Sequence, residues 1–183
     1  MANRESIADA MPHPTLPKIH GVPTYESIAD LHRRLNENAA SVQTNLGGGR
    51  HGYLALTISA QKYNQVTGHG FVIPADPGPF PILPPDATPA QVKLIETQHR
   101  EALIAFQTYN AVSNALKRQL LAAIDDTYLR GLRDNLTGYA SSTPYSILTH
   151  LYLKYGRITP NRLLENEARM KEAWDPSTPI ETL

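Results

Sequence analysis

A long apolar stripe of helical period, between residues 89 and 124, constrains the fold more than any other feature. Thr88, Pro89 and Gln91 match a capping box with proline at the first helical position. Apolar residues then recur every three or four positions, as one helix face requires: Val92, Ile95, Ala102, Leu103, Phe106, Tyr109, Leu116, Leu120 and Ile124. A helix unbroken to Ile124 is about 50 Å long at roughly 1.5 Å per residue. We predict that it is the spine of the fold.

The composition sets further limits. A chain of 183 residues with 41% hydrophobic content can form one good core or two small ones. It has no cysteine, which excludes disulfides, thiolate metal sites, cysteine nucleophiles and zinc knuckles. Lys plus Arg and Asp plus Glu each number 17, so the basic surplus of a protein bound mainly to nucleic-acid phosphates is absent.

The first 23 residues predict an extended N-terminal arm, flexible unless docked. Four prolines interrupt any continuous helix there: Pro12, Pro14, Pro17 and Pro23. The start of the chain lacks the apolar core of a signal peptide, and no later run has the length of a membrane span. We therefore expect a soluble, cytoplasmic protein with no membrane partner.

Residues 24–70 predict an N-terminal helical part. Thr24 caps a helix whose apolar face is Ile28, Leu31, Leu35, Ala39 and Val42. The glycines at 47–49 end this helix and predict a tight turn with positive φ angles. The alternative is an anion-binding nest, which is less favoured because the Gly-Lys-Ser/Thr ending of a phosphate-binding loop is missing. Residues 53–58 fit a strand or a helical turn. Ser59 caps a short helix closed by Gly68.

Seven prolines between residues 71 and 89 exclude a helix or a central strand. We predict that residues 71–88 form an extended, partly polyproline-II connector that lies along the domain surface or acts as a semi-rigid spacer. A docking segment for an aromatic groove in a partner is the rarer alternative. The main helical part then spans residues 89–176.

Four basic residues near the end of the long helix form a weak candidate nucleic-acid site: Lys117, Arg118, Arg130 and Arg133. Three nearby aspartates offset their charge, so a solvated helical surface is the favoured interpretation. Two of these, Asp125 and Asp126, are adjacent and point about 100° apart on a helix, which predicts a kink or turn rather than a shared carboxylate site. An apolar face continues through Leu132, and Thr137-Gly138 ends it.

Residues 144–176 predict two short helices joined by a corner. Thr143 and Pro144 begin the first, and Gly156 is predicted to end it in the left-handed conformation. Thr159 and Pro160 begin the second, whose inward residues are Leu163, Leu164, Met170 and Trp174. Residues 177–183 look like the start of a further helix. We therefore expect the chain to be a truncated piece of a longer protein.

The histidines do not form a metal motif. His99 lies on the long stripe with no second ligand at i+3 or i+4, which favours a core or boundary histidine. His51 and His69, with the glycine turn, are the remote alternative for a small-ligand site or an enzyme. We predict no catalytic residues, no cofactor and no metal.

Ordered segments along residues 16–183 resemble the Gag polyproteins of copia-type LTR retrotransposons, especially a Gag-like group in algae and other protists. The segments are LPKIHGVPTYESI, LGGGRHGYLAL, FVIPADPGP, ALKRQLLAAIDDTYLRGL and ILTHLYLKYGRITPNRLLENEARMKEAWDPSTPIE. The resemblance implies a helical capsid-like domain that self-assembles into the shell of a virus-like particle, with RNA gripped mainly by a downstream Cys/His knuckle.

The sequence thus predicts an all-α protein of about six or seven helices, with a Gly-rich turn and a Pro-rich connector. Its expected function is structural self-association rather than catalysis. The alternative is a domesticated Gag-derived adaptor that binds a host protein or RNA.

Overall fold

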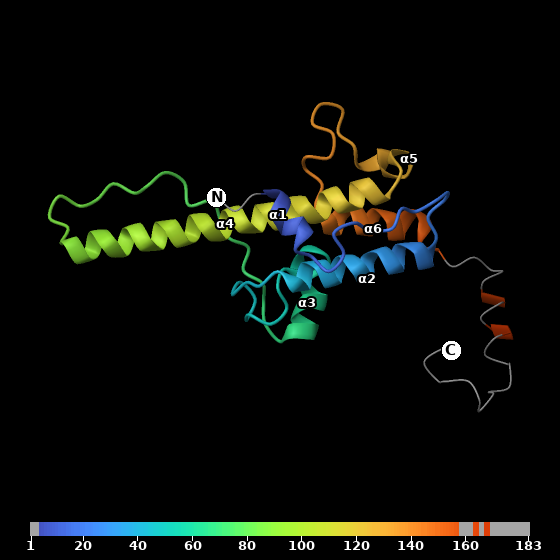
Figure 1. Cartoon of the computed structure of the whole chain (residues 1–183), viewed down its shortest axis with the longest axis horizontal. Coiled ribbons are helices and arrows are strands. Elements are labelled where there is room, and N and C mark those ends of the chain that lie inside the picture. Colours follow the sequence, from blue (N-terminus) through green and yellow to red (C-terminus); the bar gives the residue numbers. More distant parts are fainter. Residues whose placement is uncertain (1–3, 158–162, 165–166, 169–183) are drawn as a thin grey trace.

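The computed structural model describes residues 4–157, 163–164 and 167–168, and this part of the chain is all-α. It contains helices but no strand, which confirms the predicted fold class (Figure 1). The elements are α1 (Arg4–Asp9), α2 (Tyr25–Ser41), η1 (Leu54–Leu56), α3 (Ala60–Thr67), α4 (Pro89–Ala123), α5 (Asp126–Leu129), η2 (Arg130–Leu132) and α6 (Pro144–Tyr155).

The core lies where α2, the C-terminal half of α4 and α6 pack on one another. Each helix contributes side chains with almost no exposed surface: Ile28, Leu31, Leu35, Val112, Leu116, Leu120, Ile147, Leu148 and Leu151. Fully burying one such aliphatic side chain stabilises the fold by about 1.5–3 kcal/mol. The helical parts predicted on either side of the connector therefore share one core.

The predicted helix starts are confirmed by their hydrogen bonds. Thr24, Thr88 and Thr143 each accept from the backbone N–H three residues later, and the residue at that position bonds back to complete a capping box. Ser59 caps α3 in the simpler way, and Gly68 ends α3 with a left-handed φ of 71°. These local signals were readable because both partners of each bond lie within one helical turn.

The long helix is unbroken over its 35 residues, but its two halves have different surroundings. Its buried residues all fall between Val112 and Ala123. Residues 89–108, which we call the projecting half, extend beyond the body of the molecule with the connector running alongside (Figure 1). The stripe is therefore a spine for the core only in its C-terminal half.

The described part of the predicted extended arm, residues 4–23, differs from what the prolines predict. The structure places helix α1 at Arg4–Asp9, packed on α4, and the segment that follows buries Met11 and Leu16 in the core. The prolines begin only at Pro12, so they leave this first turn of helix free to form. The arm is docked.

Two buried amides hold this arm, and we call them the amide clamp: Asn38 of α2 and Gln119 of α4. Asn38 accepts from the His13 backbone N–H at 2.8 Å and donates to the His13 carbonyl at 2.7 Å. Gln119 donates to the His13 and Pro14 carbonyls at 3.1 and 3.0 Å and accepts from Asn38 at 2.9 Å. The clamp satisfies main-chain groups that would otherwise be buried without partners.

The glycine turn has the geometry predicted for it. Gly48 and Gly49 have φ angles of 81° and 85°, in the left-handed region that favours glycine. At Gly52 a Cβ would lie 2.5 Å from the Ala40 and Val42 carbonyl oxygens, so no larger residue fits. Of the two alternatives for residues 53–58, the helical turn is confirmed, as a 3₁₀ turn at Leu54–Leu56.

The segment after α4 turns sharply, as the adjacent aspartates predict. Asp125 caps α5 by accepting from the Thr127 backbone N–H at 2.8 Å, while Asp126 accepts from the Tyr139 hydroxyl at 2.6 Å. The two carboxylates have separate partners and do not share a site. The apolar helix ends earlier than predicted, at Leu132, because Asp134 then caps a loop by accepting from the backbone N–H groups of 136 and 137.

The prediction for Gly156 is wrong. Its φ is −79° and its ψ is 14°, so α6 ends without a left-handed residue. Its N–H still bonds the Tyr152 carbonyl at 3.0 Å, which closes the last turn in an ordinary conformation. Most of the predicted second helix, with Met170 and Trp174, lies outside the described residues. Leu163 and Leu164, predicted to face inward, are exposed by 52% and 64%.

His32 joins three elements in the body. Its Nδ1 lies 3.2 Å from the Tyr152 hydroxyl of α6, and its Nε2 lies 3.1 Å from the Thr57 carbonyl oxygen beside η1. Burial lowers the pKa of His32 below its usual value, against a smaller opposing effect of the Thr57 carbonyl. The neutral ring with its proton on Nε2 suits both neighbours, since it donates to the carbonyl and accepts from the hydroxyl.

Candidate interaction surface

The projecting half of α4 and the connector together expose large apolar side chains. On the helix Leu94 is 57% exposed and Ile104 55%, and these two lie about 80° apart around the helix axis at 100° per residue. Along the connector the exposed set is Val72, Ile73, Phe80 and Ile82, with Ile82 fully exposed. Exposed large apolar side chains on a protruding element make this part of the molecule a candidate interaction surface.

An aromatic cluster marks the base of this surface. Phe71, the first connector residue, packs on Tyr63 at a ring-centroid distance of 5.6 Å, on Tyr53 at 6.0 Å and on Tyr109 of α4 at 6.3 Å. Burial in this cluster raises the pKa of Tyr109 above its usual value. The Val72 N–H donates to the Leu46 carbonyl at 2.8 Å. The connector therefore leaves the body from a fixed point.

From this point the connector follows α4 with a three-residue repeat. Its half-buried residues are Phe71, Pro74, Pro77, Leu83 and Ala87, of which all but Ala87 fit this repeat. Phe80 also fits it, and although this side chain is exposed, its ring meets His99 edge-on at 5.3 Å. Three residues per turn is the repeat of a polyproline-II helix, but Gly78 has a left-handed φ of 67° and residues 85–86 form a turn, so a helix of this kind fits only residues 79–84. Of the two predicted arrangements, the structure thus has the connector lying along the protein surface, and His99 is the boundary histidine that the stripe predicts.

Two of the four basic residues predicted as a weak nucleic-acid site are engaged within the chain. The Lys117 amino group donates to the Tyr139 and Ala140 carbonyls at 3.3 and 3.1 Å, which ties α4 to the loop before α6. Arg133 forms an ion pair with Asp126 at 3.4 Å. Arg118 and Arg130 are exposed.

The glycine turn packs against the side chains of His69 and Tyr63. The His69 ring lies against Gly48, where a Cβ would come within 3.0 Å of it. The Tyr63 hydroxyl donates to the Gly47 carbonyl at 3.2 Å. Neither of the two open depressions described next includes His51 or His69. In the described residues, no group of three or more His, Cys, Asp or Glu side chains could hold a metal ion.

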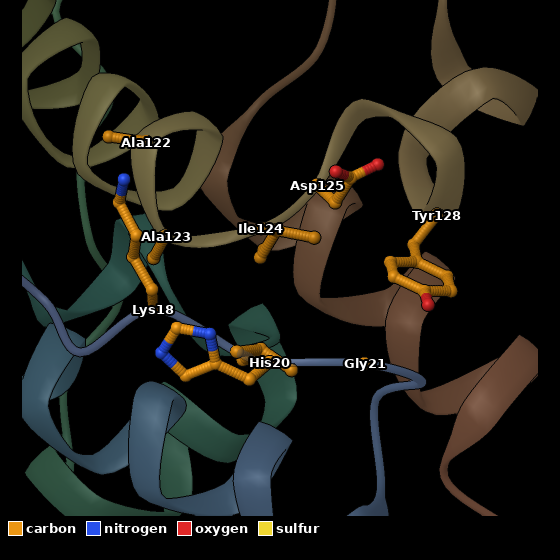
Figure 2. Close-up of a pocket in the computed structure, with 9 residues that line it drawn as sticks. Lys18, His20, Gly21, Ala122, Ala123, Ile124, Asp125 and Tyr128 are labelled. Atoms are coloured by element: carbon orange, nitrogen blue, oxygen red, sulfur yellow. The ribbon is translucent and has the colours of Figure 1, made fainter.

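The larger depression, of about 510 Å³, lies between the N-terminal arm and the end of α4 (Figure 2). Lys18 and His20 come from the arm, and Asp125 and Tyr128 from the segment that follows α4. In Figure 2 their polar ends point apart and do not converge on one point. A smaller depression of about 240 Å³ adjoins it along the arm. Hydrogen bonds from Thr127 lower the pKa of Asp125, as expected for its capping role.

The connector surface was only partly visible in the sequence. The prolines predicted an extended segment, and the three-residue repeat could have been inferred from their spacing. The exposure of Ile82 and Leu94 had no such signal, because it depends on how far the rest of the chain reaches along α4.

Comparisons of this chain with protein-family models, with curated proteins and with solved structures found no match. No helix in the described part of the chain is long and apolar enough to cross a membrane.

Proposed function

We propose that this chain is a structural protein that self-associates through the projecting half of α4, as a capsid-like region of a copia-type Gag polyprotein. In this role it has no catalytic activity and builds the shell of a cytoplasmic virus-like particle. RNA is held mainly by other regions of the polyprotein. The family resemblance of the sequence motivates the class of protein, and the surface of α4 supplies the contact.

The observation that carries the proposal is the pair Leu94 and Ile104. Both are more than half exposed on a helix that extends beyond its own core. Packing this face against a second copy removes apolar surface from water, which favours association by about 25 cal/mol per Å² before the entropic costs of binding. A protruding rigid helix also allows the contact without rearrangement of the body.

The test is the mass of the purified chain by light scattering after gel filtration, over a range of protein and salt concentrations, with electron microscopy of concentrated samples. We expect species larger than a monomer. Replacing Leu94 and Ile104 together by aspartate is expected to give a monomer, since two charges would enter the contact.

Leu136→Asp is the matched control, because Leu136 is 92% exposed in a loop away from the projecting half. It is expected to leave the mass distribution unchanged. A wild-type chain that stays monomeric and forms no particles under every condition would falsify the proposal.

A further inference from the structure

The connector residues 79–84 present two free faces of an extended, proline-rich segment. In the three-residue repeat, Phe80 and Leu83 form the face turned toward α4, and Phe80 meets His99 there. The other two faces are exposed throughout: one carries Pro81 and Pro84, and the other carries Pro79 and Ile82. Ile82 has no cover from the rest of the described chain.

The chain anchors the connector on both sides of this segment. Phe71 and Val72 fix the start of the connector to the aromatic cluster and to Leu46, and after the segment the Ala87 N–H donates to the Pro84 carbonyl at 3.1 Å in the turn that leads into α4. Prolines restrict φ along its length. Because the segment is already restricted, it loses little conformational entropy when a partner binds it. This loss of entropy normally limits the binding of extended segments.

We propose that residues 79–84 are a ligand for an aromatic-lined groove of a separate protein domain that reads polyproline-II helices. Such grooves take up the ridges made by prolines and aliphatic residues spaced at three-residue intervals. Pro81-Ile82-Leu83-Pro84 supplies a Pro-x-x-Pro core on the free faces. This contact is separate from the self-association proposed for α4 and does not depend on it.

The charge around the segment narrows the class of partner. Asp76 and Asp86 flank it, and no Lys or Arg occurs between Lys62 and Lys93. Grooves that require a basic ligand residue beside the Pro-x-x-Pro core are therefore poor partners. A groove with a neutral or basic rim is electrostatically complementary to the two aspartates.

The experiment uses the full chain and three purified probe domains with aromatic grooves, an SH3, a WW and an EVH1 domain, each isotope-labelled for NMR. We expect the groove signals of at least one probe to shift on titration with the chain. The double variant Pro81→Ala/Pro84→Ala is expected to weaken this binding by at least about tenfold. Both prolines are exposed, so the fold should tolerate the change.

Pro17→Ala is the matched control, because Pro17 is also exposed but lies in the N-terminal arm. It should bind like the wild type. Ile82→Asp tests the second face and should weaken binding as well.

The inference is overturned if no probe responds at millimolar chain concentration, or if binding is the same with and without the two prolines. A change in the mass of the chain in the proline variants, with no probe bound, would instead assign the segment to contacts between copies and likewise overturn it. The Leu94/Ile104 variant should bind the probes normally, which separates a failure here from a failure of the proposed self-association.

Discussion

The two halves of α4 are built alike and used differently. Both carry apolar residues at helical spacing, yet residues 112–123 lie against α2 and α6, while residues 89–108 have the connector alongside and contribute no buried residue. Leu116 has no exposed surface and Leu94 is 57% exposed. Periodicity thus defines which face of a helix is apolar, but the elements packed on that face decide whether it becomes core.

The largest difference in stability between the two halves of α4 should appear when one leucine in each half is truncated to alanine. We expect Leu116→Ala to lower the free energy of unfolding by about 2–5 kcal/mol, since it leaves a cavity in the core. Leu94→Ala should change it by no more than about 0.5 kcal/mol, as is usual for surface substitutions. Urea unfolding followed by circular dichroism measures both. Equal losses would show that the projecting half is covered in solution, and the comparison would then fail.

A smaller difference in stability is expected when one glutamine in each half of α4 is replaced by alanine. Gln119→Ala removes one member of the amide clamp, so that the Pro14 carbonyl and the Asn38 amide each lose a partner. We expect a loss of about 1–3 kcal/mol in unfolding free energy. Gln107→Ala, at an exposed position of the projecting half, should be nearly neutral.

Amide hydrogen exchange tests the effect of Gln119→Ala locally, at the N-terminal arm. The His13 amide, which donates to Asn38, should exchange faster in Gln119→Ala because the arm is then held less firmly. If exchange at this amide is unchanged, the clamp does not hold the arm.

The smallest effect should come from the matched helix caps. Thr88 and Thr143 each precede a proline and each complete a capping box, at the start of α4 and of α6. Replacing either by alanine should cost its helix about 1 kcal/mol. For Thr143→Ala we expect this cost in global unfolding, because α6 is part of the core. For Thr88→Ala we expect mainly local fraying, seen as faster amide exchange in the first turn of α4 with little change in the urea midpoint. Equal shifts of the midpoint would contradict the different coupling of the two halves.

The predictable parts of the fold are those that depend on residues close together in the sequence. Helix starts at Thr24, Thr88 and Thr143 follow from bonds between residues three apart, and the glycine turn follows from φ angles that glycine adopts without strain. The amide clamp was not predictable, because Asn38 and Gln119 are separated by 81 positions and no local rule links them. The wrong prediction at Gly156 has a similar origin: glycine permits a left-handed end but does not require one.

For the connector, too, one feature was predictable from the sequence and another was not. The prolines of residues 71–88 determine by themselves an extended segment, since they remove backbone donors and restrict φ. Which of its faces would be free could not be read from them. That depended on α4 lying alongside, where Phe80 meets His99 and Leu83 is half-buried.

The sequence by itself determined the all-α class, the length of the long helix and the places where helices begin, because these depend on bonds and spacings within a few residues. Tertiary structure alone decided that the N-terminal arm docks, that the apolar stripe is core only after residue 111, and that Leu94, Ile104 and Ile82 remain exposed. The physical reason is that burial is a property of two surfaces in contact, and a stripe on one helix specifies only one of them.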